Sequence, residues 1–190
     1  FMIIEYYTGD RDGPGSRFGN KPNNFYCIYN RENPIGWKSL HHDNEHTLGV
    51  SNSETNMVTP FTTAGAQWVF FNSHWLHERL ASQNADYRMH FADHVYKHFF
   101  NGGLLTPSVV QSMLNRRIAE IDLAIIAESA RWGDAKRSSP FTRNDHWYPE
   151  ISELIEIYVP SRLNVVLNQL RSVGWYPDVS PPTFGKTGSN

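Results

Sequence analysis

The sequence predicts an α+β domain that is mostly helical and carries a β-hairpin near its N-terminus. Aromatic and β-branched residues at 25–29, a turn signal at 33–36 and a second strand-like run at 37–40 predict the hairpin. From residue 73 onward, helical periodicity and capping signals dominate. The 190 residues, 39% of them hydrophobic, suffice for one ordinary domain with a core.

The limits of the expected helices follow from capping residues, prolines and glycines. The predicted starts are a cap at Ser73, a cap at Asn84, and the pairs Thr106-Pro107, Tyr148-Pro149 and Pro160-Ser161. The first helix is expected to reach Leu80, and the last is expected to end at Gly174, because glycine commonly follows a helix. The tail after Trp175 is rich in Pro, Gly and Ser, which predicts extended chain.

Composition and charge exclude several classes of protein. A formal net charge of −2 gives no basic footprint for nucleic acid, and no apolar run approaches the ~18 residues that a membrane span needs. The single cysteine, Cys27, excludes an internal disulfide framework, and its place in a strand-like run predicts a buried apolar residue. The segment 1–7 has no basic region or cleavage site typical of a signal peptide. It resembles a structural element already in progress, so we expect a natural sequence cut upstream.

Polar residues follow one another in an order that protein kinases use for phosphoryl transfer. Two acids, Asp10 and Asp12, lie in a loop, the pair Asn23-Asn24 comes next, and Asp43 follows the hairpin. In kinases a loop aspartate orients the acceptor hydroxyl, an asparagine holds Mg²⁺, and an aspartate beyond a short hairpin joins the metal to the phosphates. Hard oxygen ligands of this kind suit Mg²⁺. Asp and Asn are also common turn formers, so the order alone is a weak signal.

Four segments, taken in order, resemble the motifs of the CotH kinase family of atypical protein kinases. They are Tyr7-Thr8-Gly9-Asp10-Arg11-Asp12, Pro22-Asn23-Asn24-Phe25-Tyr26, His42-Asp43-Asn44-Glu45-His46-Thr47-Leu48 and Glu128-Ser129-Ala130-Arg131-Trp132-Gly133-Asp134. The resemblance continues through Ser161-Arg162 and ends near Gly174-Trp175-Tyr176-Pro177, so it covers nearly the whole chain.

The resemblance implies the C-terminal lobe of a divergent protein-kinase-like fold over residues 1–177, followed by an extended tail at 178–190. Within it we expect a catalytic loop at 8–24, a hairpin at 25–42, a metal-binding segment at 43–48 and a helical region at 73–174. Asp12 matches the catalytic-loop aspartate, with Asp10 a close second. Asn24 and Asp43 match the ligands for metal and ATP phosphates, and Glu45 is an auxiliary metal ligand.

The implied activity is transfer of phosphoryl from ATP to serine or threonine of a protein substrate, with Mg²⁺ or Mn²⁺. Many members of the family belong to spore coats or to secreted and surface proteins of bacteria, which implies a surface or coat protein as substrate and an extracellular or spore-surface location. The sequence lacks a glycine-rich loop followed by a strand lysine, the parts that grip ATP. We therefore expect the natural full-length protein to be active and this chain alone to be inactive.

Two alternative functions are also compatible with the sequence. His42, Glu45 and His46 spell the H-x-x-E-H motif of inverted zincins, a class of zinc peptidases that requires a helix at this position. The domain could also serve as a non-catalytic surface or adhesion module, because a fold does not determine function.

Arg131 and Asp134, with Glu128 one turn earlier, are expected to form a structural brace rather than a site.

Overall fold

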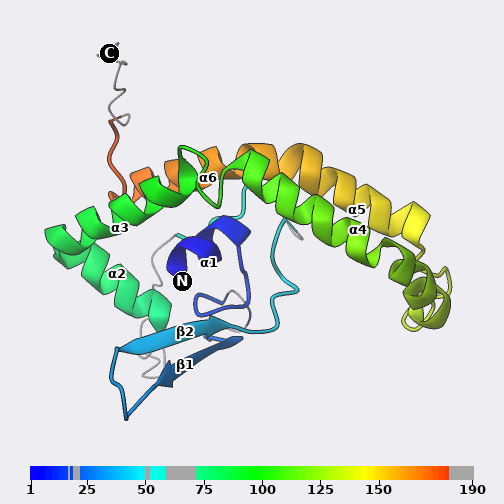
Figure 1. The fold of residues 1–190 in the computed structure, drawn as a ribbon, viewed down its shortest axis with the longest axis horizontal. Helices are drawn as coiled ribbons and strands as arrows, with labels where there is room; N and C mark the ends of the chain where they lie inside the picture. Colours follow the sequence, from blue (N-terminus) through cyan, green and yellow to red (C-terminus); the bar gives the residue numbers. More distant parts are fainter. Residues whose placement is uncertain (17, 19–21, 50–51, 59–71, 180–190) are drawn as a thin grey trace, which may run out of the picture.

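The computed structural model describes residues 1–16, 18, 22–49, 52–58 and 72–179. Within these ranges the protein is α+β, mostly helical with one two-stranded antiparallel hairpin, as the sequence predicts. The short helix α1 (Met2–Thr8) lies between the hairpin and an arch of longer helices (Figure 1). Across the described ranges, no helix combines the length and hydrophobicity of a membrane span.

The hairpin forms where the sequence predicts it. Strand β1 (Phe25–Tyr29) pairs with β2 (Trp37–His41), and the register sets Phe25 opposite His41. The connecting turn is closed by Asn30, whose side-chain oxygen accepts hydrogen bonds from two backbone N–H groups ahead of it. The Asx turn therefore supplies the chain reversal that a short hairpin needs.

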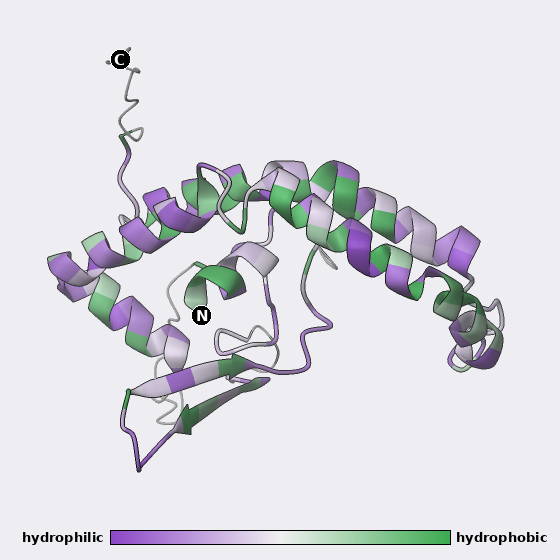
Figure 2. Ribbon diagram, viewed as in Figure 1, coloured by the Kyte–Doolittle hydropathy of each residue, from purple (hydrophilic) through white to green (hydrophobic). Residues whose placement is uncertain are grey.

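The inner face of the hairpin contacts α2 (Ser73–Gln83), and the outer face is exposed. Ser39 lies 2.7 Å from Ser73 through their hydroxyl oxygens, and Cys27 lies on the same face. The prediction that Cys27 is buried is wrong: the residue is exposed, because it faces an open cleft beside α2 rather than a packed core. Figure 2 shows apolar residues along β1, in an element that solvent reaches on its outer face.

Asparagine side chains cap the starts of α2 and α3, and proline marks the start of α4. The cap of α2 is Asn72 rather than the expected Ser73, and its side chain accepts a hydrogen bond from the backbone N–H of Trp75. Helix α3 (Ala85–Phe99) is capped by Asn84 as predicted, and α4 (Pro107–Trp132) begins with proline directly after Thr106, also as predicted. Local signals were enough here because a cap acts within one turn.

The C-terminal helical region is continuous, which the sequence did not predict. The chain runs through η2 (Arg143–Trp147), α5 (Tyr148–Glu153), η3 (Leu154–Tyr158) and α6 (Val159–Ser172) without leaving helical conformation. Pro149 and Pro160 do not separate helices, because each follows a π-helical turn whose wider winding accommodates a residue without an N–H. Figure 1 shows this rod beside α4, running in the opposite direction.

The core joins α1 to the helices from the other end of the chain. Its fully buried members include Tyr6, Tyr7, Val95, Phe99, Val159, Val166 and Leu170. Arg162 of α6 is also fully buried, and its guanidinium donates to the backbone carbonyls of Tyr6, Tyr7 and Ser53. This side chain therefore satisfies the free carbonyls at the end of α1, which have no partner within the helix.

Two further expectations concern the C-terminal half. The brace expected at 128–134 is wrong: Arg131 lies over the Trp132 ring at 4.9 Å and makes no ion pair with Glu128 or Asp134, all of them exposed. The chain stays packed through Trp175 and Tyr176, which are buried. Residues 180–190 of the expected tail, and residues 17 and 19–21 of the expected catalytic loop, lie outside the described residues.

Candidate functional site

The candidate site begins where α1 ends. Gly9 adopts a positive φ of 66° as the C-cap, and this left-handed residue turns the chain away from the helix. A side chain at Gly9 would meet the Arg162 guanidinium 3.2 Å away. The turn carries Asp10 and Asp12 inward, and both are buried, at 2% and 8% exposure. Buried acids need polar partners, because an unpaired carboxylate loses much solvation free energy.

Asp12 is the centre of a hydrogen-bonded network. One carboxylate oxygen accepts from the Ser16 hydroxyl at 2.8 Å. The other accepts from the side-chain amides of Asn23 at 2.9 Å and Asn24 at 3.0 Å. Three donors from the same loop therefore fix the direction of this carboxylate, and one of them is the predicted metal ligand Asn24.

Asn24 connects Asp12 to the segment after β2. Its side-chain nitrogen also donates to the backbone carbonyl of Asp43 at 3.2 Å, and its own carbonyl accepts from the His42 N–H. Because the nitrogen faces Asp12 and Asp43, the side-chain oxygen of Asn24 has no hydrogen bond among the described residues. Asp43 is exposed, and the described part of the chain gives its carboxylate no partner either. These are hard oxygen atoms of the type that Mg²⁺ and Mn²⁺ prefer.

Two of the three predicted metal ligands have a backbone conformation that is uncommon outside glycine. Asn24 has φ 41° and Asp43 has φ 52°, and Leu48 nearby has φ 56°. Such conformations cost of order 1–3 kcal/mol each and persist where the surrounding structure enforces them. They gather at functional sites more often than elsewhere, so their presence just before the hairpin and in the segment after it favours a functional assignment.

Glu45 and His46 extend the site beside Asp12. One potential ligand atom from each of these three residues lies within 4.8 Å of the other two. Residues 42–46 form a turn rather than a helix, so His42 and His46 are not held one helical turn apart as the zincin arrangement requires. His42 instead packs against the Tyr26 ring, with ring centroids 5.1 Å apart.

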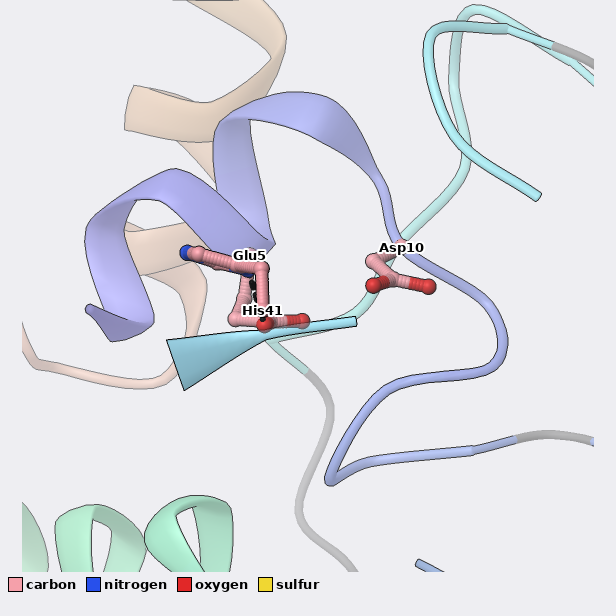
Figure 3. A group of neighbouring side chains, drawn as sticks. All are labelled: Glu5, Asp10 and His41. Carbon is pink, nitrogen blue, oxygen red and sulfur yellow. Dashed lines mark ion pairs between the residues drawn. The ribbon is translucent and has the colours of Figure 1, made fainter. Parts of the chain in front are cut away.

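Asp10 has different neighbours from Asp12. Its carboxylate accepts from the Asp12 N–H at 2.9 Å and from the Asn44 side chain at 2.6 Å. It also lies near Glu5 of α1 and His41 at the end of β2, as Figure 3 shows. Of the two acids that the sequence left as alternatives for the catalytic role, Asp12 is therefore the one in direct contact with Asn24.

Glu5 and His41 are polar site residues that sequence reasoning missed. Glu5 is 3% exposed, and its carboxylate lies 2.8 Å from the His41 ring nitrogen Nδ1. Burial raises the pKa of Glu5, the proximity of His41 opposes this, and the charge of Asp10 adds to the increase. The available signal was an acid within the apolar run 1–7, where helical burial would otherwise predict only hydrophobic residues.

A large apolar cleft opens on the other side of α1. Its volume is about 1160 Å³, and its walls come from α1, the inner face of the hairpin, and helices α2, α3 and α4. His90, His94 and His98 follow one another along the α3 wall, and burial together with the other two histidines lowers the pKa of His94. The acidic residues of the candidate site do not line this cleft.

Comparisons with family models, curated proteins and solved structures give no match for this chain. Functional inference therefore depends on the residues and their geometry.

Proposed function

We propose that this chain carries the acceptor-orienting and metal-binding part of an atypical protein kinase of the CotH type. The natural full-length protein would transfer the γ-phosphoryl of ATP to a serine or threonine of a surface or coat protein. The observation that carries the proposal is the Asn24 side chain, which contacts both the Asp12 carboxylate and the Asp43 backbone. Phosphoryl transfer needs an acceptor-orienting acid beside oxygen ligands for metal, and this contact joins the two.

Each residue has a distinct role in this proposal. Asp12, held by three donors, would orient the acceptor hydroxyl and take its proton. The side-chain oxygens of Asn24 and Asp43 would hold Mg²⁺ or Mn²⁺, with Glu45 as an auxiliary ligand. When bound, the metal would supply positive charge that offsets the negative charge developing on the transferred phosphoryl group.

The outer face of the hairpin supports a nucleotide as the co-substrate. Side chains alternate between the two faces of a strand, so Tyr26, Ile28 and Leu40 point away from α2. They are 59%, 54% and 43% exposed, an apolar surface interrupted by the exposed Lys38 opposite Ile28. A base is flat and apolar, and its phosphates are anionic, so ATP would match an apolar face that leads into a metal site.

The test uses the natural full-length protein with Asp43→Ala. We expect the variant to lose phosphoryl transfer from ATP labelled at the γ position, in the presence of Mg²⁺ or Mn²⁺, with an unchanged far-UV circular dichroism spectrum. Asp93→Ala is the matched control, because Asp93 is an exposed acid on α3. Retained transfer in Asp43→Ala would refute the assignment. In a parallel assay with ATP labelled at the α position, incorporation of that label into the substrate would indicate nucleotidyl transfer instead.

A non-catalytic binding module is the second candidate, and the apolar cleft beside α1 favours it. Clefts of this size with mostly apolar walls are common ligand sites. The first discriminating result would be a wild-type full-length protein that transfers no phosphoryl group with Mg²⁺ or Mn²⁺. If the Asn24→Ala variant also folds normally, the binding-module interpretation gains support over the kinase.

A further inference from the structure

We propose that Glu5, Asp10 and His41 form a second divalent-metal site, which selects a transition ion such as Zn²⁺. One potential ligand atom from each residue lies within 4.8 Å of the other two. The three come from different elements: α1, the loop after it, and the end of β2 (Figure 3). The inference does not depend on the kinase proposal, since none of the three residues is assigned there.

The buried carboxylate of Glu5 is the first observation that points to a bound ion. It is 3% exposed, and the described residues offer it one polar contact, the His41 Nδ1 atom at 2.8 Å from Oε1. The Oε1 atom receives no well-directed hydrogen bond in this arrangement. Two ligands of one metal ion also lie about 3 Å apart when each is about 2 Å from it, so the contact suits shared coordination.

Space between the two carboxylates is the second observation. A Cβ atom at Gly13 would lie 2.5 Å from Oε2 of Glu5 and 3.0 Å from Oδ2 of Asp10. Both oxygens therefore face the same small volume, and glycine at this position keeps a side chain out of it. Gly13 has no positive φ, so the requirement for glycine here is one of space rather than of backbone conformation.

The donor set favours a transition ion over Mg²⁺. Mg²⁺ prefers oxygen ligands, whereas a histidine with two carboxylates suits Zn²⁺ and related ions. The His41 ring is held in place by the Phe1 ring, with ring centroids 4.4 Å apart. An ion here would join α1 to the hairpin and fix the loop that carries Asp12.

The experiment is a titration of this chain with Zn²⁺, measured by isothermal titration calorimetry. Every protein in the experiment carries His94→Ala, which disrupts the row of histidines on α3. We expect one equivalent to bind, and Glu5→Gln and His41→Ala to weaken it about tenfold or more. Glu5→Gln keeps the shape of the buried side chain, so the fold should survive. His42→Ala, at the exposed neighbouring histidine, should leave the affinity unchanged.

Two results would overturn the proposal. One is an absence of Zn²⁺ binding in the chain that carries His94→Ala alone. The other is binding that His46→Ala abolishes and His41→Ala does not, because the ion would then lie beside Asp12 and Glu45. The kinase assignment is tested by phosphoryl transfer in Asp43→Ala and this site by Zn²⁺ affinity in His41→Ala, so the failure of one can be told apart from the failure of the other.

Discussion

Replacing Arg162 by alanine should destabilise the protein by about 3 kcal/mol. The guanidinium donates to the carbonyls of Tyr6, Tyr7 and Ser53, and the Tyr158 hydroxyl also donates to Tyr7 at 2.6 Å. Tyr7 therefore keeps a partner in the variant, and two carbonyls lose theirs. The Tyr6 carbonyl is buried and the Ser53 carbonyl is partly buried. A buried carbonyl without a hydrogen bond costs about 1–3 kcal/mol, so ~2 kcal/mol for the first and ~1 kcal/mol for the second give about 3 kcal/mol.

Urea unfolding followed by tryptophan fluorescence and circular dichroism measures this difference. For a chain of this size, about 3 kcal/mol corresponds to a decrease in Tm of about 6–12 °C. Arg162→Lys should lose nearly as much, because one ammonium group cannot reach three carbonyls in the planar geometry of arginine. Arg117→Ala is the control, since Arg117 is exposed and, among the described residues, pairs with Glu120 alone. A loss below about 1 kcal/mol in Arg162→Ala would refute the reasoning.

Two further predictions concern His77 and Cys27. Burial lowers the pKa of His77 to about 3, so the unfolded state binds a proton below its ordinary pKa of 6.5 while the folded state does not. Stability should therefore fall as pH decreases from 6.5 toward 3, by up to about 1.4 kcal/mol per pH unit. His77→Gln should flatten this slope in urea titrations at pH 7 and pH 5, and an unchanged slope would contradict the assignment. The Cys27 thiol is exposed, so it should react stoichiometrically with a disulfide reagent such as DTNB without denaturant. Protection until urea is added would show that the thiol is buried.

Much of the fold follows from signals that act over a few residues. The hairpin, the Asn84 cap and the Thr106-Pro107 start are local, because a turn or a cap is decided within one or two turns of chain. The helical rod was not predicted, since proline is an ordinary helix stop and a π turn leaves no sequence signature of comparable strength.

The candidate site likewise has one part that the sequence predicts and another that only the packing of distant segments reveals. The order of Asp12, Asn24 and Asp43 along the chain predicted that they belong to one site, and the structure brings the three together through hydrogen bonds. The chemistry assigned to them is still a prediction. Glu5 and His41 were missed because they are 36 positions apart, and only the packing of α1 on the hairpin makes them neighbours.

The bonds between α1 and α6 determine when the candidate site can form during synthesis. Arg162 and Tyr7 are separated by 155 positions in the chain. The carbonyls at the end of α1 therefore gain their hydrogen-bond donors on α6 only after nearly the whole domain has been synthesised. At about 5–20 residues per second, that delay is about 8–30 seconds on the ribosome. During this interval the loop with Asp10 and Asp12 lacks its anchor, so the nascent chain is most in need of protection by chaperones before α6 emerges.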